Sequence, residues 1–96
     1  MGAGQGGPRL GVSPYIIKIR PAALRELRKI DKSVQPRIRG AIELLAQDPR
    51  PPASRPLRGR DGYRLRVGDY RILYTIDDGV LTIVVVTIGH RRDVYQ

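Results

Sequence analysis

Three arginines in the second half of the chain are spaced so that one antiparallel hairpin brings them onto the same face of a sheet. Gly68 and Asp69 form a strong signal for a two-residue turn, which fixes the residues that lie opposite each other in the flanking strands. Arg66 then faces Arg71, and Arg64 lies on the same face two residues earlier. Like charges in opposed positions destabilise a sheet by about 0.2–1 kcal/mol. Because folding alone does not favour this pair, the pattern predicts a binding site for an anion such as phosphate.

A second turn signal, at Asp78 and Gly79, predicts that the chain continues into a further antiparallel hairpin with Asp77 opposite Val80. Residues 80–88 are almost wholly apolar, which is typical of a central strand covered on both faces. Side chains alternate across a strand, so the two hairpins together predict an apolar face opposite the arginines. Its predicted members are Tyr63, Leu65, Ile72, Tyr74, Ile76, Leu81, Ile83 and Val85.

The first half of the chain predicts one strand and two helices that would cover this apolar face. Residues 15–20 are rich in β-branched side chains and predict a first strand beside residues 80–88. Pro21 suits the first turn of a helix, and apolar residues recur at helical spacing as far as Ile30. Ser33 is a suitable N-cap for a second amphipathic helix, which runs to Leu45. Residues 48–56 contain four prolines and predict a stiff, extended connection.

The composition indicates one small, strongly basic domain. The 96 residues include 18 Lys and Arg against 9 Asp and Glu, which gives a net charge of +9. Residues 1–13 contain five glycines and few apolar side chains, so we expect a disordered tail ahead of a domain that spans residues 14–96. A compact protein of this charge usually binds a polyanion, while a membrane surface or an acidic protein partner fits the charge equally well.

The composition also argues against several kinds of site. The chain has no cysteine, one histidine and no clustered carboxylates, which disfavours a disulfide framework and a metal site built by the protein. No apolar run approaches the roughly 18 residues that span a bilayer, and the N-terminus lacks the apolar stretch of a signal peptide. We therefore expect a cytoplasmic protein without a membrane partner, a metal or another cofactor.

Four segments of the chain resemble the RelE branch of the RelE/ParE toxin superfamily of bacterial toxin–antitoxin systems. They are PLRG at residues 56–59, YRLRVGDYRILY at 63–74, IDDG at 76–79 and GHRRDVY at 89–95, and the resemblance extends over the helices at 24–45. It implies an α+β domain of the order β-α-α-β-β-β, with an antiparallel meander and a helical hairpin packed on one face. It also implies an endoribonuclease that cleaves messenger RNA on the ribosome without metal and is inhibited by a cognate antitoxin.

The resemblance assigns roles to the arginines position by position. Arg64 and Arg66 match two basic strand residues that bind the RNA backbone, and Arg71 matches an arginine that holds phosphate. Arg58 lies in the matching PLRG segment and is assigned to phosphate binding with them. Arg91 matches an arginine that stabilises the transition state or the leaving group. Arginines suit this chemistry because they can neutralise a pentacoordinate phosphorane dianion in place of a metal.

Two residues near the end of the chain are candidates for proton transfer. Tyr95 matches a C-terminal tyrosine that stacks on or activates the reacting nucleotide, and His90 titrates near neutrality. Arg64 and Arg66 do not serve as a base, because arginine stays protonated. Strict alternation from the strand at 80–88 would place His90 on the arginine face and send Arg91 to the apolar face. We therefore predict that the alternation breaks at Gly89.

Two alternatives to the nuclease follow from the same resemblance. The first is a ParE-like protein that inhibits DNA gyrase by binding and performs no RNA chemistry. The second is a catalytically inactive, nucleic-acid-binding regulator that acts only inside a complex. The combination of Arg71, Arg91 and Tyr95 favours the nuclease, because an inhibitor that acts by binding does not require it.

Overall fold

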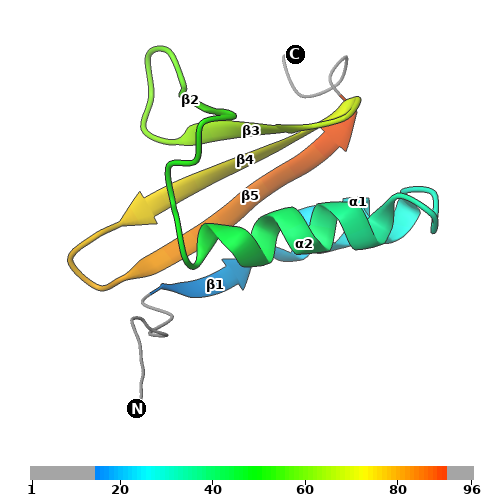
Figure 1. Cartoon of the computed structure of the whole chain (residues 1–96), viewed down its shortest axis with the longest axis horizontal. Helices are drawn as coiled ribbons and strands as arrows, with labels where there is room; N and C mark the ends of the chain where they lie inside the picture. Colours follow the sequence, from blue (N-terminus) through cyan, green and yellow to red (C-terminus); the bar gives the residue numbers. More distant parts are fainter. Residues whose placement is uncertain (1–14, 91–96) are drawn as a thin grey trace.

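The computed structural model describes residues 15–90 as a five-stranded sheet with two helices (Figure 1). In chain order the elements are β1 (Ile16–Ile19), α1 (Pro21–Lys29), α2 (Gln35–Leu45), β2 (Ser54–Pro56), β3 (Tyr63–Val67), β4 (Tyr70–Asp77) and β5 (Thr82–His90). The strand order is β1-β5-β4-β3-β2, with β1 parallel to β5 and the other neighbours antiparallel. This confirms the predicted α+β fold class, with β2 as an additional short strand. The tail predicted over residues 1–13 lies outside the described residues.

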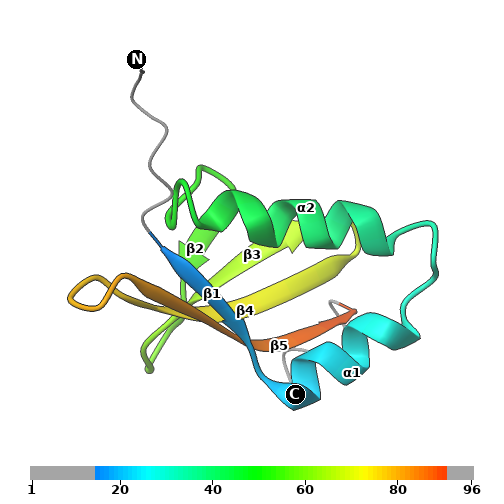
Figure 2. The same ribbon diagram turned by 90° about the horizontal axis from the view of Figure 1, so that it is seen from below.

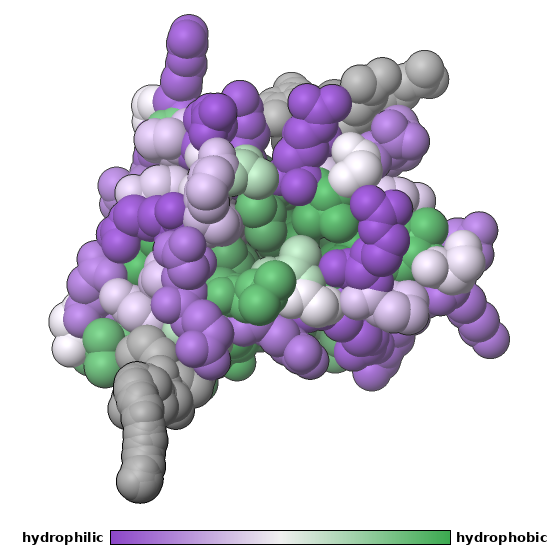
Figure 3. All heavy atoms as spheres, in the orientation of Figure 1, coloured by the Kyte–Doolittle hydropathy of each residue, from purple (hydrophilic) through white to green (hydrophobic). Residues whose placement is uncertain are grey.

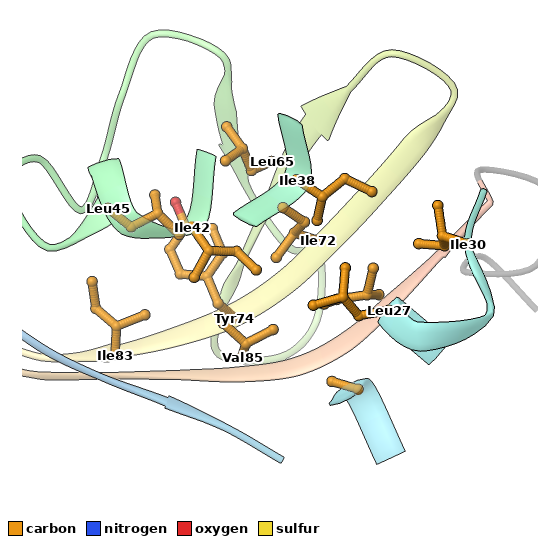
Figure 4. Close-up of a cluster of buried hydrophobic side chains, with 12 residues drawn as sticks. Leu27, Ile30, Ile38, Ile42, Leu45, Leu65, Ile72, Tyr74, Ile83 and Val85 are labelled. Carbon is orange, nitrogen blue, oxygen red and sulfur yellow. The ribbon is translucent and has the colours of Figure 1, made fainter. Parts of the chain in front are cut away.

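The two helices bury one face of the sheet in a single apolar core. Figure 2 shows that they lie apart, with α1 packed against β5 and α2 across β1 and β3. The core residues drawn in Figure 4 converge from both helices and from β3, β4 and β5. The cluster consists of Ala23, Leu27, Ile30, Ile38, Ile42, Leu45, Leu65, Ile72, Tyr74, Ile83, Val85 and Ile88. On the side of the molecule seen in Figure 3, hydrophobic residues gather toward the middle and hydrophilic residues surround them.

The connection between the helices is built by Asp31 rather than by Ser33. The Asp31 carbonyl accepts the N–H groups of Val34 and Gln35 at 2.8 and 3.1 Å, and its side chain accepts the Ser33 N–H at 3.1 Å. The N-cap of α2 is Val34, so the prediction of Ser33 as the cap is wrong. Neither helix has the length and apolar character that crossing a membrane requires, as far as residues 15–90 are concerned.

The β3–β4 hairpin has the predicted register throughout. Val67 pairs with Tyr70, Arg66 with Arg71, and the pairing continues to Tyr63 opposite Tyr74. Gly68 has φ 59, in the left-handed region that the first central position of a tight hairpin turn requires. A turn of two residues leaves no other register, so the alternation of core and arginine faces follows directly from it.

The β4–β5 connection is longer than predicted. Asp77 pairs with Thr82 and not with Val80, because residues 78–81 form the connection. The Asp77 side chain accepts the N–H groups of Gly79 and Val80 at 2.9 and 3.2 Å, which satisfies the backbone of this wider loop. Leu81 has φ 49 and is 43% exposed, so its predicted place in the core is wrong.

The alternation of β5 breaks at Val86, three residues before the predicted position at Gly89. Leu73 pairs with Thr87 whereas Tyr74 pairs with Val85, so Val86 is the extra residue of a β-bulge. The bulge allows Val85 and Ile88, three residues apart, to enter the same core. The prediction of a break at Gly89 is therefore wrong, and the pairing is regular from Thr87 to the end of β5.

The proline-rich segment forms the edge strand β2 in addition to an extended connection. Pro56 pairs with Tyr63, and residues 57–62 form a loop closed by a bond from the Leu57 N–H to the Gly62 carbonyl at 2.9 Å. Gly62 has φ 121, and a Cβ atom at this position would lie 2.9 Å from the Tyr74 carbonyl oxygen. Only glycine fits where this loop returns to the sheet.

A polar cluster ties four distant segments together at the end of the sheet. Asp78 accepts a hydrogen bond from the Tyr15 hydroxyl at 2.6 Å and forms a salt bridge with Arg50 at 2.9 Å. Arg50 also donates to the Tyr63 hydroxyl at 3.0 Å and lies over its ring. The bonds from Arg50 and then Tyr15 lower the pKa of Asp78 below its usual 3.8, and the bond to Asp78 raises the pKa of Tyr15.

Replacing Asp78 with Asn should lower the melting temperature at neutral pH, because Asn keeps the shape but loses the charge that Arg50 and Tyr15 contact. The folded-state pKa of Asp78 is depressed, so its contribution is present above 3.8 and is lost as the pH falls through the folded value. The difference in melting temperature between wild type and Asp78→Asn should therefore shrink as the pH falls below 3.8. Thermal denaturation followed by circular dichroism over this pH range measures it. Asp61→Asn is the control, since Asp61 makes no hydrogen bond or salt bridge within residues 15–90; an equal loss in both variants would contradict the prediction.

Candidate anion-binding site

Four arginines surround one hollow on the sheet face that the helices leave uncovered. The hollow has a volume of about 290 Å³ and is lined by Ala53, Arg55, Arg64, Arg66 and Arg71. Arg64, Arg66 and Arg71 alternate with core residues along β3 and β4, so their side chains point away from the core. Arg55 pairs with Arg64 across β2 and β3 and therefore lies on the same face. The predicted set of Arg64, Arg66 and Arg71 is thus brought together, and Arg55 joins it.

The arginines form two cross-strand pairs. Arg66 lies opposite Arg71 across β3 and β4, as predicted, and Arg55 lies opposite Arg64 across β2 and β3. Each pair places like charges on neighbouring strands, where they weaken the sheet. The hollow therefore concentrates positive charge in a small volume at a cost in stability, which is the arrangement expected of an anion site.

The four side chains differ in exposure. Arg71 is 9% exposed and donates to the Tyr70 carbonyl at 3.3 Å, so its guanidinium is held at the floor of the hollow. Arg64 is half-buried, and Arg66 and Arg55 are exposed. Arg55 donates from Nη1 to the carbonyls of Pro52 and Ser54, each at 2.8 Å. One buried arginine beside three more exposed arginines suits an anion that binds in the hollow from the solvent side.

Arg55 was not among the residues predicted for the site. Its segment is rich in prolines, which conceals the three-residue strand β2. The strand is defined by pairing that the local sequence does not reveal, since Ser54, Arg55 and Pro56 lie opposite the three residues from Leu65 back to Tyr63. An arginine at the centre of such a short edge strand falls on the same face as Arg64.

His90 lies on the opposite face of the sheet from the arginines. The bulge at Val86 places Gly89 opposite Arg71 and His90 opposite Tyr70, with the two rings edge to face at 5.7 Å. His90 lines a separate cavity of about 380 Å³ that α1 closes with Glu26 and Lys29. The structure therefore does not bring His90 together with the arginine hollow.

The remaining predicted residues lie away from the hollow or outside the described range. Arg58 is exposed in the loop between β2 and β3 and does not line the hollow. Arg91 and Tyr95 lie outside the described residues. Among residues 15–90, the lining of the hollow provides positive charge and hydrogen-bond donors but no histidine or carboxylate. Within residues 15–90, no three His, Cys, Asp or Glu side chains are grouped as a metal site would need.

The similarity of this chain to known proteins identifies it as a toxin of the type II toxin–antitoxin systems. The family model described as ParE toxin of type II toxin–antitoxin system, parDE, matches residues 17–95. The chain belongs to this family, and its similar relatives place it with the RelE-type toxins.

Three relatives show how far the similarity extends. A RelE-like toxin protein of Escherichia coli is 36% identical over 87 residues, which cover 85% of this chain and 90% of the relative. Toxin RelG of Mycobacterium tuberculosis is 34% identical over 91 residues, which cover 86% of this chain and 98% of RelG. A chain in the crystal structure of the intact E. coli RelBE toxin–antitoxin complex has a TM-score of 0.70 at 26% identity, over 79% of this chain and 95% of that one.

Replacing Arg66 with Gln should raise the free energy of unfolding by about 0.2–1 kcal/mol at low ionic strength, because it removes the like charge opposite Arg71. The gain should shrink as salt is added, since salt screens repulsion between exposed charges. Urea unfolding at low and high salt measures both effects. Arg39→Gln removes the same charge from α2, four residues before Glu43, and should not be stabilising. Lower stability of Arg66→Gln at low salt would mean that Arg66 is a structural residue.

Proposed function

We propose that this protein is a ribosome-dependent mRNA endonuclease, acting in the cytoplasm and inhibited by a cognate antitoxin. The observation that carries the proposal is the hollow of Arg55, Arg64, Arg66 and Arg71, which presents guanidinium groups to a phosphate on an open sheet face. Membership of the toxin family supplies the biological setting, and the RelE-type relatives favour RNA as the target.

The proposed reaction is attack of a ribose 2′-hydroxyl on the adjacent phosphate. The O2′–P bond forms, the P–O5′ bond breaks, and the products are a 2′,3′-cyclic phosphate and a 5′-hydroxyl. The proton leaves O2′ for a base, and another is delivered to O5′. Negative charge builds on the phosphoryl oxygens in between, and Arg71 with Arg66 would stabilise it through charge-assisted hydrogen bonds. Arg64 would hold the backbone beside the reacting phosphate.

His90 and Tyr95 are the candidates for the acid and the base of this reaction. His90 faces Tyr70 and α1, so a proton from a phosphate in the hollow would have to pass to the other side of the sheet to reach it. This placement favours Tyr95 over His90 as the group that acts on the reacting nucleotide. Arg91 keeps its proposed role at the leaving group. Arg58 would contact a phosphate outside the hollow, from its exposed loop.

The proposed antitoxin is a segment of acidic or amphipathic character that covers basic and apolar surface. The net charge of +9 favours an anionic partner. Apolar side chains are also available, with Leu44 67% exposed on α2 and Ile16 61% exposed on β1. The solved E. coli relative is a toxin–antitoxin complex, which supports inhibition by a bound partner.

Inhibition of DNA gyrase is the second candidate function, because the matching family model is that of the ParE toxin. This function requires a binding surface but no nuclease chemistry. The combination of Arg71, Arg91 and Tyr95 favours the nuclease, since an inhibitor that acts by binding does not require it.

Brief induction of the toxin should produce new mRNA 5′ ends inside translated codons, and Arg71→Gln should remove most of them. The reason is that Gln cannot supply the charge that the developing dianion needs. Sequencing of mRNA 5′ ends measures the cuts, and circular dichroism checks that the variant is folded. Arg39→Gln, on α2 and away from the hollow, is the matched control and should cut as wild type does. Intact mRNA with an SOS response in the wild type would support the gyrase function instead.

A further inference from the structure

The hollow contains two arginine pairs, and cleavage at one phosphate needs only one of them. We propose that it binds two successive phosphates of a single RNA strand, with Arg66 and Arg71 at the first and Arg55 and Arg64 at the second. The inference rests on the proposed function in taking RNA as the ligand. It adds a subsite on the edge strand β2 and a role for Arg55, which the family resemblance does not include.

The spacing of the pairs fits a nucleotide repeat. Arg64 and Arg66 are two residues apart on β3, so the two pairs are offset by about 6.7 Å along the strand. One pair lies between β3 and β4 and the other between β2 and β3, which adds about 4.8 Å across the strands and puts the pair centres roughly 8 Å apart. Successive phosphates of an extended single strand are separated by a comparable distance. Within each pair the two guanidiniums come from neighbouring strands and can donate to one phosphate between them.

Arg55 is held ready for an anion by its own strand. Both Nη1 hydrogens are taken up by the carbonyls of Pro52 and Ser54, which restrains the side chain. Nε and Nη2 make no hydrogen bond in the part of the chain that the structure describes, and they carry three further N–H groups. Arg55 also forms no salt bridge with any residue between 15 and 90. Restraint before binding reduces the entropy lost when the phosphate is bound.

A charged edge strand has a second explanation. Positive charge on an edge strand discourages pairing with other chains, and Arg55 would then need no ligand. If Arg55 serves only that role, the effect of replacing it on ligand affinity does not depend on the number of phosphates in the ligand. The two explanations therefore differ in the response of an Arg55 variant to short oligonucleotides.

The test compares 2′-O-methyl UpU, which has one phosphate, with 2′-O-methyl UpUpU, which has two; neither has the hydroxyl that attacks. Dissociation constants are measured by NMR titration of wild type, Arg55→Gln and Arg71→Gln at several salt concentrations. UpUpU should bind wild type several-fold more tightly than UpU, and Arg55→Gln should remove this advantage with a much smaller effect on the affinity for UpU. Its salt-dependence slope for UpUpU should fall by about 0.7, the value for one phosphate contact on a single strand.

The outcomes separate the failure of this inference from that of the proposed function. If Arg55→Gln keeps the advantage of UpUpU while Arg71→Gln loses both ligands, the second subsite is wrong and RNA binding at the first stands. If wild type binds neither oligonucleotide, the two-phosphate site is overturned, while the ribosome-dependent endonuclease is judged by the mRNA 5′ ends. If the Arg55 dependence is found but mRNA remains uncut in cells, the two-phosphate site stands and the endonuclease does not. Arg39→Gln should match wild type for both oligonucleotides.

Discussion

Burial of one sheet face beneath two helices is the constraint on which the rest of this structure depends. Leu65, Ile72 and Tyr74 must face α1 and α2 to form the core. Because side chains alternate along a strand, the residues next to them in sequence must face the other way. Arg64, Arg66 and Arg71 are those residues. The energy of the apolar core therefore holds mutually repelling arginines together, at about 0.2–1 kcal/mol for each opposed pair.

The bulge at Val86 decides which residues of β5 border the arginines. It moves Ile88 into the core and so reverses the faces of the residues that follow. Gly89 comes to lie beside Arg71 and adds no side chain, while His90 turns toward Tyr70 and α1. One extra residue thus separates a titratable group from the charged hollow, while it lets Val85 and Ile88 enter the same core.

The parts of the fold that the sequence predicts well are those with a single physical solution. The Gly68-Asp69 turn permits one register, so the β3–β4 hairpin and three of the four hollow arginines follow from it. At the next turn the Asp77 side chain supports a wider loop by binding two backbone N–H groups, and the turn signal alone does not distinguish these cases. The bulge and β2 depend on packing and on pairing partners distant in sequence, so Arg55 and the orientation of His90 require the structure.

The edge strand β2 has a consequence for how copies of this protein meet. An edge strand normally offers unpaired backbone groups on which another chain can add a strand, and this one borders the arginine hollow. It is only three residues long, Pro56 has no N–H to donate, and Arg55 brings positive charge. A copy that approached this edge would find little backbone to pair with and a charge like its own. The short strand therefore acts against self-association at the edge of the sheet that borders the arginine hollow.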